Sequence, residues 1–403
     1  MHRRLRIAVP FAAMTVAASL TFCAMTTASA ATAAHHAQPG LMVAAGHTAG
    51  RSAVPWKQVG PGWTLVTYTT ATEFAAHPKR GATTLYLVDP AGGKYVMYRW
   101  PHVPAYGGVD LLAWSGDATR AMLEVAKSPT SNAQQLDQLT LATGKLTRLP
   151  LPSGAVPISY TRPDGLAVLA YLVLKSPAEV QIVRYSLSGA LEKVLYTQKT
   201  TKNGGGFVNI SQSSPYNPAG TSIALTITTG SAKTPESTLL ISNAGGVIHR
   251  YGSADSCFFV RWWTASQLLT DNCAAKHLFL TPAGGAAPKS LAPAVTSAER
   301  FVQDAWSLAG HVYVEESGPA CGTGILTVIR NGHLAEVTVP KLNAGADVVT
   351  TSSSKLLIVA ERCMASSGLL WFNPHNASEV QVLAKNQGQG VIGEVPYYAT
   401  SGG

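Results

Sequence analysis

Acidic side chains recur at matching points along the chain, at or just before short hydrophobic runs. They are Asp110, Asp255, Asp304, Asp347 and Glu394, and Asn209 stands in an equivalent place. Carboxylates that crowd together raise one another's pKa values and attract a cation or a basic group. Alternatively, Asp and Asn side chains accept hydrogen bonds from exposed backbone N–H groups at strand ends. The two interpretations predict either a ligand-binding site or a structural role for the same residues.

Sequence motifs of established chemistry are lacking. The chain has no G-x-S-x-G, no H-E-x-x-H, no phosphate-binding loop and no dinucleotide fingerprint. Its histidines beyond the N-terminal region are His77, His102, His249, His277, His311, His333 and His375. None stands at the spacing of a catalytic triad or a ligand set, so we expect them at exposed turns. We predict no catalytic residue, no metal ligand and no cofactor, although a ring of carboxylates would be able to hold a divalent cation.

The elements that would position these side chains are clearest in residues 109–150. This stretch contains four short runs rich in β-branched, aromatic and leucine residues, at 109–114, 120–126, 135–141 and 146–149, each followed by Gly, Pro, Ser, Asp or Thr. Short strands broken by such turns are typical of an antiparallel meander. We therefore expect one four-stranded sheet here.

The same unit recurs along the chain. A turn between the third and fourth strands needs a residue that accepts a positive φ at low cost. Candidates for it are Gly92, Gly144, Gly189, Gly245, Gly284, Gly332 and Asn376, which lie about 40 to 55 residues apart. That period is the one expected of the blades of a β-propeller.

A second marker falls between the first and second strands of a unit. It is seen in WSGDATRAML from Trp114, TRPDGLAVLA from Thr161 and NPAGTSIALT from Asn217, and later copies are degenerate. These turns resemble those of TolB-like and WD40-like propeller repeats. The resemblance implies an all-β β-propeller of four-stranded antiparallel blades. The seven recurring turns predict seven blades, or six if residues 64–100 were an appendage. It implies no activity, because the fold hosts lyases, lactonases, peptidase accessory domains and binding scaffolds.

The blade borders follow from the two markers. Blades two to seven are expected at residues 109–150, 156–198, 209–252, 257–291, 301–340 and 347–383. Blade one shows only three runs, at 63–69, 84–88 and 95–100, which look like its second, third and fourth strands. The C-terminal run at 390–400 has the length and character to supply the missing first strand, which would close the ring and remove exposed edges. Residues 56–403 are thus predicted to form a single domain.

The alternation of turns in such a blade defines two ends of the ring. Loops joining one blade to the next share an end with the loops between second and third strands, and we call this end the connector face. The opposite end, where the remaining turns lie, is the turn face. The acidic positions at the innermost strands would crown the channel mouth on the connector face. Further charged residues expected there are Glu73, Lys127, Lys175, Asp271, Glu315, Glu316, Glu361 and Arg362.

The first residues indicate export. Arg3, Arg4 and Arg6 precede an apolar run and then Ala28-Ser29-Ala30, which is the pattern of a secretory signal peptide over residues 1–30. No later stretch is long and apolar enough to span a bilayer, so we expect no transmembrane segment in the mature chain. Residues 31–55 are rich in Ala, Gly and His without periodicity, and we predict a flexible mature N-terminus.

Cysteine usage is consistent with an oxidising compartment. Beyond the signal peptide the chain has Cys257, Cys273, Cys321 and Cys363, an even number that predicts two disulfides. The blade borders favour Cys257 with Cys273 across one hairpin, and Cys321 with Cys363 between neighbouring loops. A metal site is the alternative, but no C-x-x-C or suitably spaced His accompanies these cysteines.

The charge composition limits the classes of binding partner to be expected. The formal net charge is +9, and only 13% of residues are charged against a usual share of roughly 25%. No concentrated basic stripe with aromatics is present, so we expect no nucleic-acid partner. We predict a secreted or envelope-located, monomeric, non-catalytic scaffold that binds an envelope or extracellular protein, peptide or glycan. A propeller enzyme, such as a metal-assisted lyase or lactonase using the channel-mouth carboxylates, and an accessory domain separated from its partner domain are the alternatives.

Overall fold

The computed structural model describes residues 42–70, 81–103, 108–128, 131–175, 178–199, 207–209, 214–228, 236–252, 257–272, 274–318, 324–340, 342, 345–362, 365–383 and 391–397. Within these ranges the chain forms strands and two short 3-10 helices, η1 (Arg51–Ala53) and η2 (Trp56–Gln58). No helix among the described residues has the length and apolar character needed to cross a membrane.

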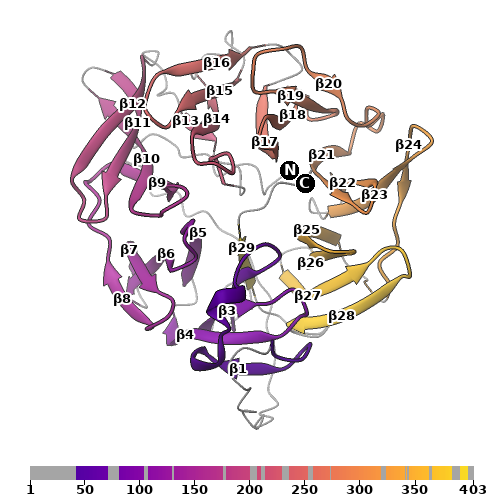
Figure 1. The fold of residues 1–403 in the computed structure, drawn as a ribbon, viewed down its shortest axis with the longest axis horizontal. Coiled ribbons are helices and arrows are strands. Elements are labelled where there is room, and N and C mark those ends of the chain that lie inside the picture. Colours follow the sequence, from indigo (N-terminus) through magenta and orange to yellow (C-terminus); the bar gives the residue numbers. More distant parts are fainter. Residues whose placement is uncertain are drawn as a thin grey trace.

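Seven sheets, each built on four antiparallel strands, surround a central axis and form a β-propeller (Figure 1). From the innermost strand outward, blade one contains β29 (Val391–Pro396), β2 (Thr64–Thr69), β3 (Gly81–Val88) and β4 (Lys94–Val103). Blade two contains β5 (Val109–Trp114), β6 (Arg120–Ser128), β7 (Ser131–Thr140) and β8 (Lys145–Arg148). Blade three contains β9 (Ala155–Tyr160), β10 (Ala167–Lys175), β11 (Ala178–Ser186) and β12 (Leu191–Lys199).

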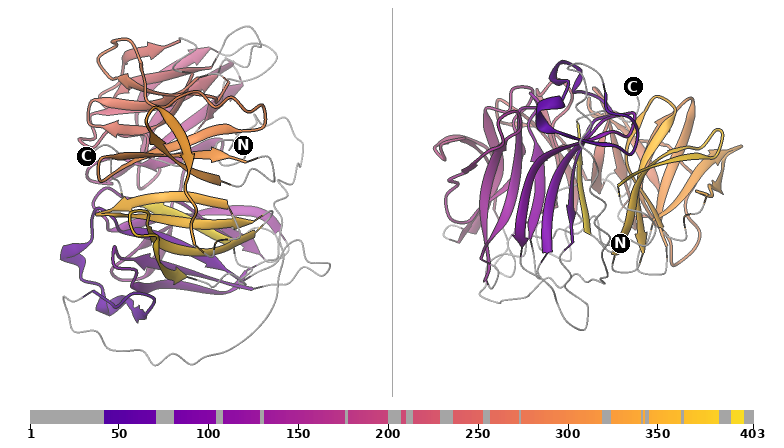
Figure 2. Two further views of the ribbon diagram at one scale, coloured as in Figure 1. Left: turned by 90° about the vertical axis from the view of Figure 1, so that its right-hand side faces the viewer. Right: turned by 90° about the horizontal axis from the view of Figure 1, so that it is seen from below.

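The other four blades follow the same order. Blade four contains β13 (Phe207–Asn209), β14 (Ser222–Thr228), β15 (Ser237–Ser242) and β16 (Val247–Tyr251), and blade five β17 (Phe258–Thr264), β18 (Gln267–Asp271), β19 (Leu278–Pro282) and β20 (Lys289–Ser290). Blade six contains β21 (Phe301–Leu308), β22 (His311–Ser317), β23 (Gly324–Arg330) and β24 (His333–Glu336), and blade seven β25 (Gly345–Ser352), β26 (Lys355–Arg362), β27 (Ala365–Asn373) and β28 (Ser378–Leu383). The strands run roughly along the ring axis (Figure 2). The seven-bladed fold predicted from the repeat is confirmed.

The turns between third and fourth strands explain why the period was readable. Gly189 has a φ of +85°, and a Cβ built there would lie 2.0 Å from the carbonyl oxygen of Pro150 on the preceding blade. Only glycine satisfies both the backbone and the close approach. In blades five and seven the positive φ falls one residue later than the expected mark, at Gly285 and Ala377.

The two ends of the chain meet in blade one. β29 pairs antiparallel with β2 over Thr64↔Pro396 to Thr69↔Val391, so the C-terminal strand is the innermost strand of the first blade. The Tyr397 amide donates to the Trp63 carbonyl oxygen at 2.7 Å just beyond the ladder. The predicted closure is confirmed.

The N-terminal segment differs from its prediction. Residues 42–55 belong to the stretch expected to be flexible, but the structure places them against blade one, where β1 (Thr48–Gly50) pairs in parallel with β4 and adds a fifth strand. The Val43 amide donates to the Tyr95 hydroxyl at 2.9 Å. Val43 and Ala49 are buried in the core, and this burial fixes a segment that has no periodicity of its own. Residues 1–41 lie outside the described part, so the predicted signal peptide stays a prediction.

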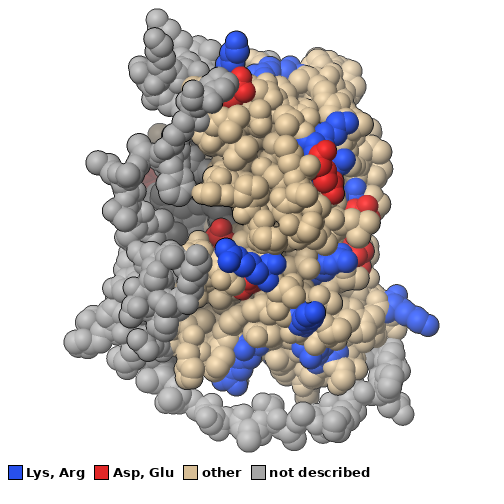
Figure 3. All heavy atoms as spheres, turned by 90° about the vertical axis from the view of Figure 1, so that its left-hand side faces the viewer, with Lys and Arg blue, Asp and Glu red and all other residues tan. Residues whose placement is uncertain are grey.

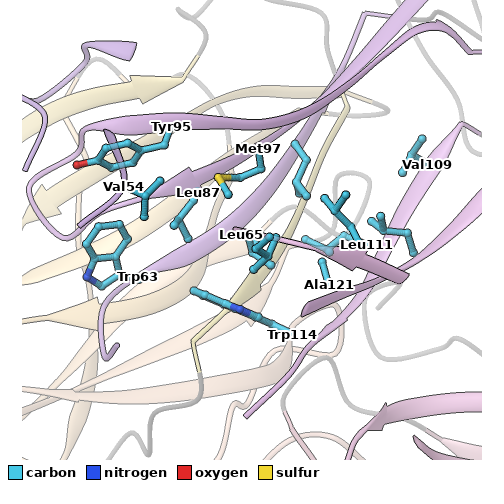
Figure 4. Close-up of a cluster of buried hydrophobic side chains, with 14 of the residues drawn as sticks. Val54, Trp63, Leu65, Leu87, Tyr95, Met97, Val109, Leu111, Trp114 and Ala121 are labelled. Carbon is cyan, nitrogen blue, oxygen red and sulfur yellow. The ribbon is translucent and has the colours of Figure 1, made fainter. Parts of the chain in front are cut away.

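The hydrophobic core lies between neighbouring blades. In the largest cluster Leu65 and Leu87 of blade one pack with Leu111 and Trp114 of blade two (Figure 4). Similar clusters join blades three and four, five and six, six and seven, and seven and one. Burying each large apolar side chain contributes about 1.5–3 kcal/mol, so the interfaces between sheets hold the ring together.

Candidate functional site

The acidic positions singled out from the sequence lie on innermost strands wherever the structure describes them. Asp110 is on β5, Asn209 on β13, Asp304 on β21, Asp347 on β25 and Glu394 on β29. Asp255 and the side chain of Asn209 lie outside the described residues. These innermost strands surround the central axis of the ring (Figure 1). The individual side chains, however, have different surroundings.

Asp304 is paired with a basic residue that the sequence interpretation missed. Its Oδ2 forms an ion pair with the guanidinium of Arg261, which comes from β17 of the preceding blade. The Arg261 Cζ lies 3.2 Å from the ring centroid of Trp306, so the cation also stacks on an aromatic face. Only 8% of the Arg261 side chain and 19% of the Asp304 side chain are exposed. The pair therefore joins blade five to blade six and is largely shielded from water.

Asp347 is buried, with 1% exposure. It packs against the neighbouring blade, because a Cβ built at Gly324 on β23 would lie 2.2 Å from its Oδ1. This glycine is needed to make room for the carboxylate. Asp347 thus lies in the contact between blades six and seven.

Glu315 also joins two blades. Its Oε2 accepts a hydrogen bond at 2.8 Å from the backbone amide of Val348, which is on β25 of blade seven. The side chain is buried, and a charge-assisted bond of this kind is among the stronger hydrogen bonds of a protein. Glu316 beside it is buried as well and forms an ion pair with Arg300 at 3.7 Å. Both acids were expected on the connector face, and both lie in the last part of β22.

Two predicted positions keep partly exposed carboxylates. Asp110 has the Gln134 amide 3.4 Å from its Oδ2, and it is half-buried. Glu394, also half-buried, lies opposite Val66 in the blade-one ladder. β29 and β5 are the innermost strands of adjacent blades. Among the predicted acids, Asp110 and Glu394 therefore combine a partly exposed side chain with a place on neighbouring innermost strands.

The other charged residues expected on the connector face are described only in part. Asp271 is buried at the end of β18. Lys127, Lys175, Glu361 and Arg362 lie in described strands, but their side chains, like the whole of Glu73, are outside the described part. The extended ring of charges therefore stays a prediction.

One cysteine can be placed. Cys257 is buried and disulfide-bonded. Its amide donates to the Asp271 carbonyl oxygen at 3.1 Å, at the end of the β17–β18 hairpin. Cys273, Cys321 and Cys363 lie outside the described residues, so the predicted pairings remain untested. In the described part of the chain no three His, Cys, Asp or Glu side chains gather as metal ligands would.

The turn face carries a well-formed hydrogen-bond network at Asp117. Its Oδ1 accepts from the Ser115 hydroxyl at 2.5 Å, and its Oδ2 accepts from the Thr119 hydroxyl and from Arg120 at 2.8 and 3.1 Å. Burial acts to raise the pKa of Asp117, but these hydrogen bonds and the Arg120 charge outweigh it and lower the pKa. The turn that resembles TolB-like repeats is therefore a structural device.

On the side drawn in Figure 3, the charged side chains of the described residues are spread over the lateral surface of the ring. Lys and Arg side chains are scattered there among uncharged residues, with Asp and Glu close to several of them. Arg184 and Glu192, for example, form an exposed ion pair at 2.9 Å on blade three.

No protein-family model and no curated protein sequence matches the chain. Its likeness to solved structures is one of fold. A prolyl endopeptidase structure aligns at 14% identity and a TM-score of 0.52, over 81% of this chain and 50% of that one. The chain thus spans about half the length of the peptidase. The propeller of the Trilobed protease from Pyrococcus furiosus aligns at 12% identity and a TM-score of 0.50, over 80% and 93% of the two chains.

That Pyrococcus furiosus domain has an open velcro topology. In the present chain β29 pairs with β2 and closes blade one. TolB from Acinetobacter baumannii also aligns, at 13% identity and a TM-score of 0.41, over 83% and 67% of the two chains. The propeller fold implied by the TolB-like turns is confirmed by the seven blades of the structure. Identities this low show nothing about the chain beyond its fold.

Proposed function

We propose that the chain is an exported, monomeric, non-catalytic propeller that binds an envelope or extracellular protein, peptide or glycan on its connector face. The observation that carries the proposal is that acids predicted on the connector face hold neighbouring blades together. Asp304 is held by Arg261 across blades five and six, and Glu315 is held by the Val348 amide across blades six and seven. These carboxylates stabilise the ring, and a rigid ring is suited to presenting loops to a partner.

The connector face is the more suitable end for binding. Its loops join blades and second to third strands, and loops held by a rigid scaffold commonly carry recognition. Asp110, the second residue of β5, and Glu394, midway along the adjacent innermost strand β29, would offer partly exposed carboxylates to a cationic or hydrogen-bond-donating group of the partner. Export is supported by the signal-peptide pattern of residues 1–30 and by the disulfide at Cys257.

Affinity capture from envelope extract would test the proposal. The mature chain would be compared with an Asp110→Asn, Glu394→Gln variant and with a control, Glu379→Gln on the outer strand β28. We expect a partner that is retained by the wild type and by the control and is lost from the double variant. Equal retention by all three proteins would exclude these carboxylates from the binding surface.

The same preparations would test the enzyme alternative. Divalent metal would be quantified in each protein, and the wild type would be assayed for lactone hydrolysis and for lyase activity. A stoichiometric cation lost from the Asp110→Asn, Glu394→Gln variant, together with turnover, would replace the scaffold proposal with a metal-assisted enzyme.

A further inference from the structure

Two histidines from different blades meet on the turn face. His311 begins β22 of blade six, and His375 lies in the turn between β27 and β28 of blade seven. Their imidazole rings are 5.6 Å apart between centroids, with an angle of 49° between the ring planes. Both residues are exposed. Their spacing in the sequence does not connect them, because they are brought together only by the packing of neighbouring blades.

The backbone at both positions is fixed by tight turns. His311 follows a two-residue turn in which Ala309 and Gly310 have φ values of +47° and +79°, and it pairs with Leu308. The His375 amide donates to the Asn373 Oδ1 at 3.0 Å, which holds the second turn. Only side-chain torsions remain free at the two histidines. Binding a ligand between them would therefore cost little conformational entropy.

The separation of the rings suits a shared metal ion. Neutral imidazole is the commonest metal ligand in proteins, and a zinc ion lies about 2.0–2.1 Å from each ligating nitrogen in a tetrahedral arrangement. Two rings that share such an ion have centroids about 5 Å apart by the same geometry. The observed separation needs an adjustment of only a few tenths of an ångström, which side-chain rotation supplies.

We propose that His311 and His375 form a two-histidine site for a divalent transition-metal ion such as Zn²⁺ on the turn face, linking blade six to blade seven. Water would complete the coordination, because both rings are exposed. Arg330 at the end of β23 and Lys355 at the start of β26 lie near the same end of these blades. Their positive charge opposes a cation, so the affinity is moderate. The site is independent of the proposed partner surface, which lies at the opposite end of the ring.

Calorimetric titration of the mature full-length chain with zinc chloride tests the site. The N-terminal region also contains two adjacent histidines, His35 and His36, which are able to bind zinc weakly on their own. Both are replaced with alanine in every sample. This background protein is compared with His311→Ala, with His375→Ala and with a control, His333→Ala, an exposed histidine at the start of β24. All three substitutions are at exposed positions, so each variant is expected to fold.

We expect the background protein to bind one zinc ion. Each of His311→Ala and His375→Ala weakens binding at least about tenfold, since loss of even an outer-shell partner costs about 10- to 100-fold in metal affinity. His333→Ala leaves the affinity unchanged. Zinc also raises the thermal unfolding midpoint of the background protein, because a ligand that binds only the folded state stabilises it, and this shift is absent in the two site variants.

Three results would overturn the proposal. One is a background protein that binds no zinc, and another is binding that survives both site substitutions. The third is an equal loss on His333→Ala, which would mean that the ion is not held by the pair described here. Far-ultraviolet circular dichroism of each variant ensures that any loss reflects the ligand set and not unfolding.

Discussion

The ion pair between Arg261 and Asp304 is predicted to hold blade five against blade six. Replacing Arg261 with Met keeps an apolar side chain but removes the guanidinium that stacks on Trp306, and it leaves the Asp304 carboxylate, which is only 19% exposed, without its cation. Removing one partner of a buried pair costs about 3–5 kcal/mol. Because Asp304 keeps some access to water, we expect Arg261→Met to lower the free energy of unfolding by about 3 kcal/mol, the lower end of that range.

A double-mutant cycle separates the pair from its surroundings. The free energy of unfolding is measured in urea at pH 7 by tryptophan fluorescence for the wild type, Arg261→Met, Asp304→Asn and the double variant. We expect a coupling energy of about 2 kcal/mol. The matched control is the cycle for Arg184 and Glu192, whose side chains are 25% and 37% exposed, and there we expect less than about 1 kcal/mol.

The outcome bears directly on the role of Asp304. A coupling energy no larger than that of the exposed control pair would refute the conclusion that this contact joins the blades. Asp304 would then return to the group of carboxylates available for a ligand in the channel, and the observation that carries the proposed function would be lost.

Three further predictions concern other contacts of the ring. Gly189→Ala is expected to lower the free energy of unfolding by at least about 2 kcal/mol, because its Cβ would lie 2.0 Å from a carbonyl oxygen. Gly246 has a similar φ but nothing within 4 Å of its Cβ, so Gly246→Ala should lower the free energy of unfolding by only about 1 kcal/mol. Urea unfolding of both variants checks this difference. Tyr95→Phe removes the hydroxyl that accepts from the Val43 amide, so it should destabilise the chain by about 1 kcal/mol and make residues 42–50 more sensitive to limited proteolysis, and unchanged cleavage would contradict it. The pKa of Asp117 is lowered in the folded state, so its stabilising contribution is present above the unfolded value of about 3.9 and is lost as the pH falls through the folded pKa; the stability difference between wild type and Asp117→Asn should therefore shrink below about pH 4, and a difference independent of pH would argue against it.

The fold was readable from the sequence because its information is local and repeated. Each blade is recognisable in the sequence by its short apolar runs and by a turn residue, such as Gly144 or Gly189, that accepts a positive φ. Even the closing strand β29 could be anticipated, since one blade was short of a strand and one run was left over. These inferences need only the meander and its period.

The candidate site was less readable because its contacts join residues that are distant in sequence. Arg261 is a single basic residue inside the apolar run FFVRWW, and nothing local shows that its partner is Asp304, 43 positions later. Asp347 was placed at a channel mouth by strand phase alone, but its burial depends on the space left by Gly324 in another blade. β1 was not predicted for the same reason: it is a three-residue strand, and its pairing with the distant strand β4 is decided by packing.

The closure of blade one also sets an order of events for a chain that is made from its N-terminus. β1 can pair with β4 as soon as residues 48–103 have been synthesised. β2 cannot pair with β29 until the C-terminal strand has been made, because contacts such as that between Thr67 and Gly393 span 326 positions. Until those last residues arrive, the inner edge of β2 is an unpaired strand and a template for aggregation. Blades two to seven must therefore be synthesised before the first blade is protected, and a chaperone that shields a growing chain would be needed longest at this one edge.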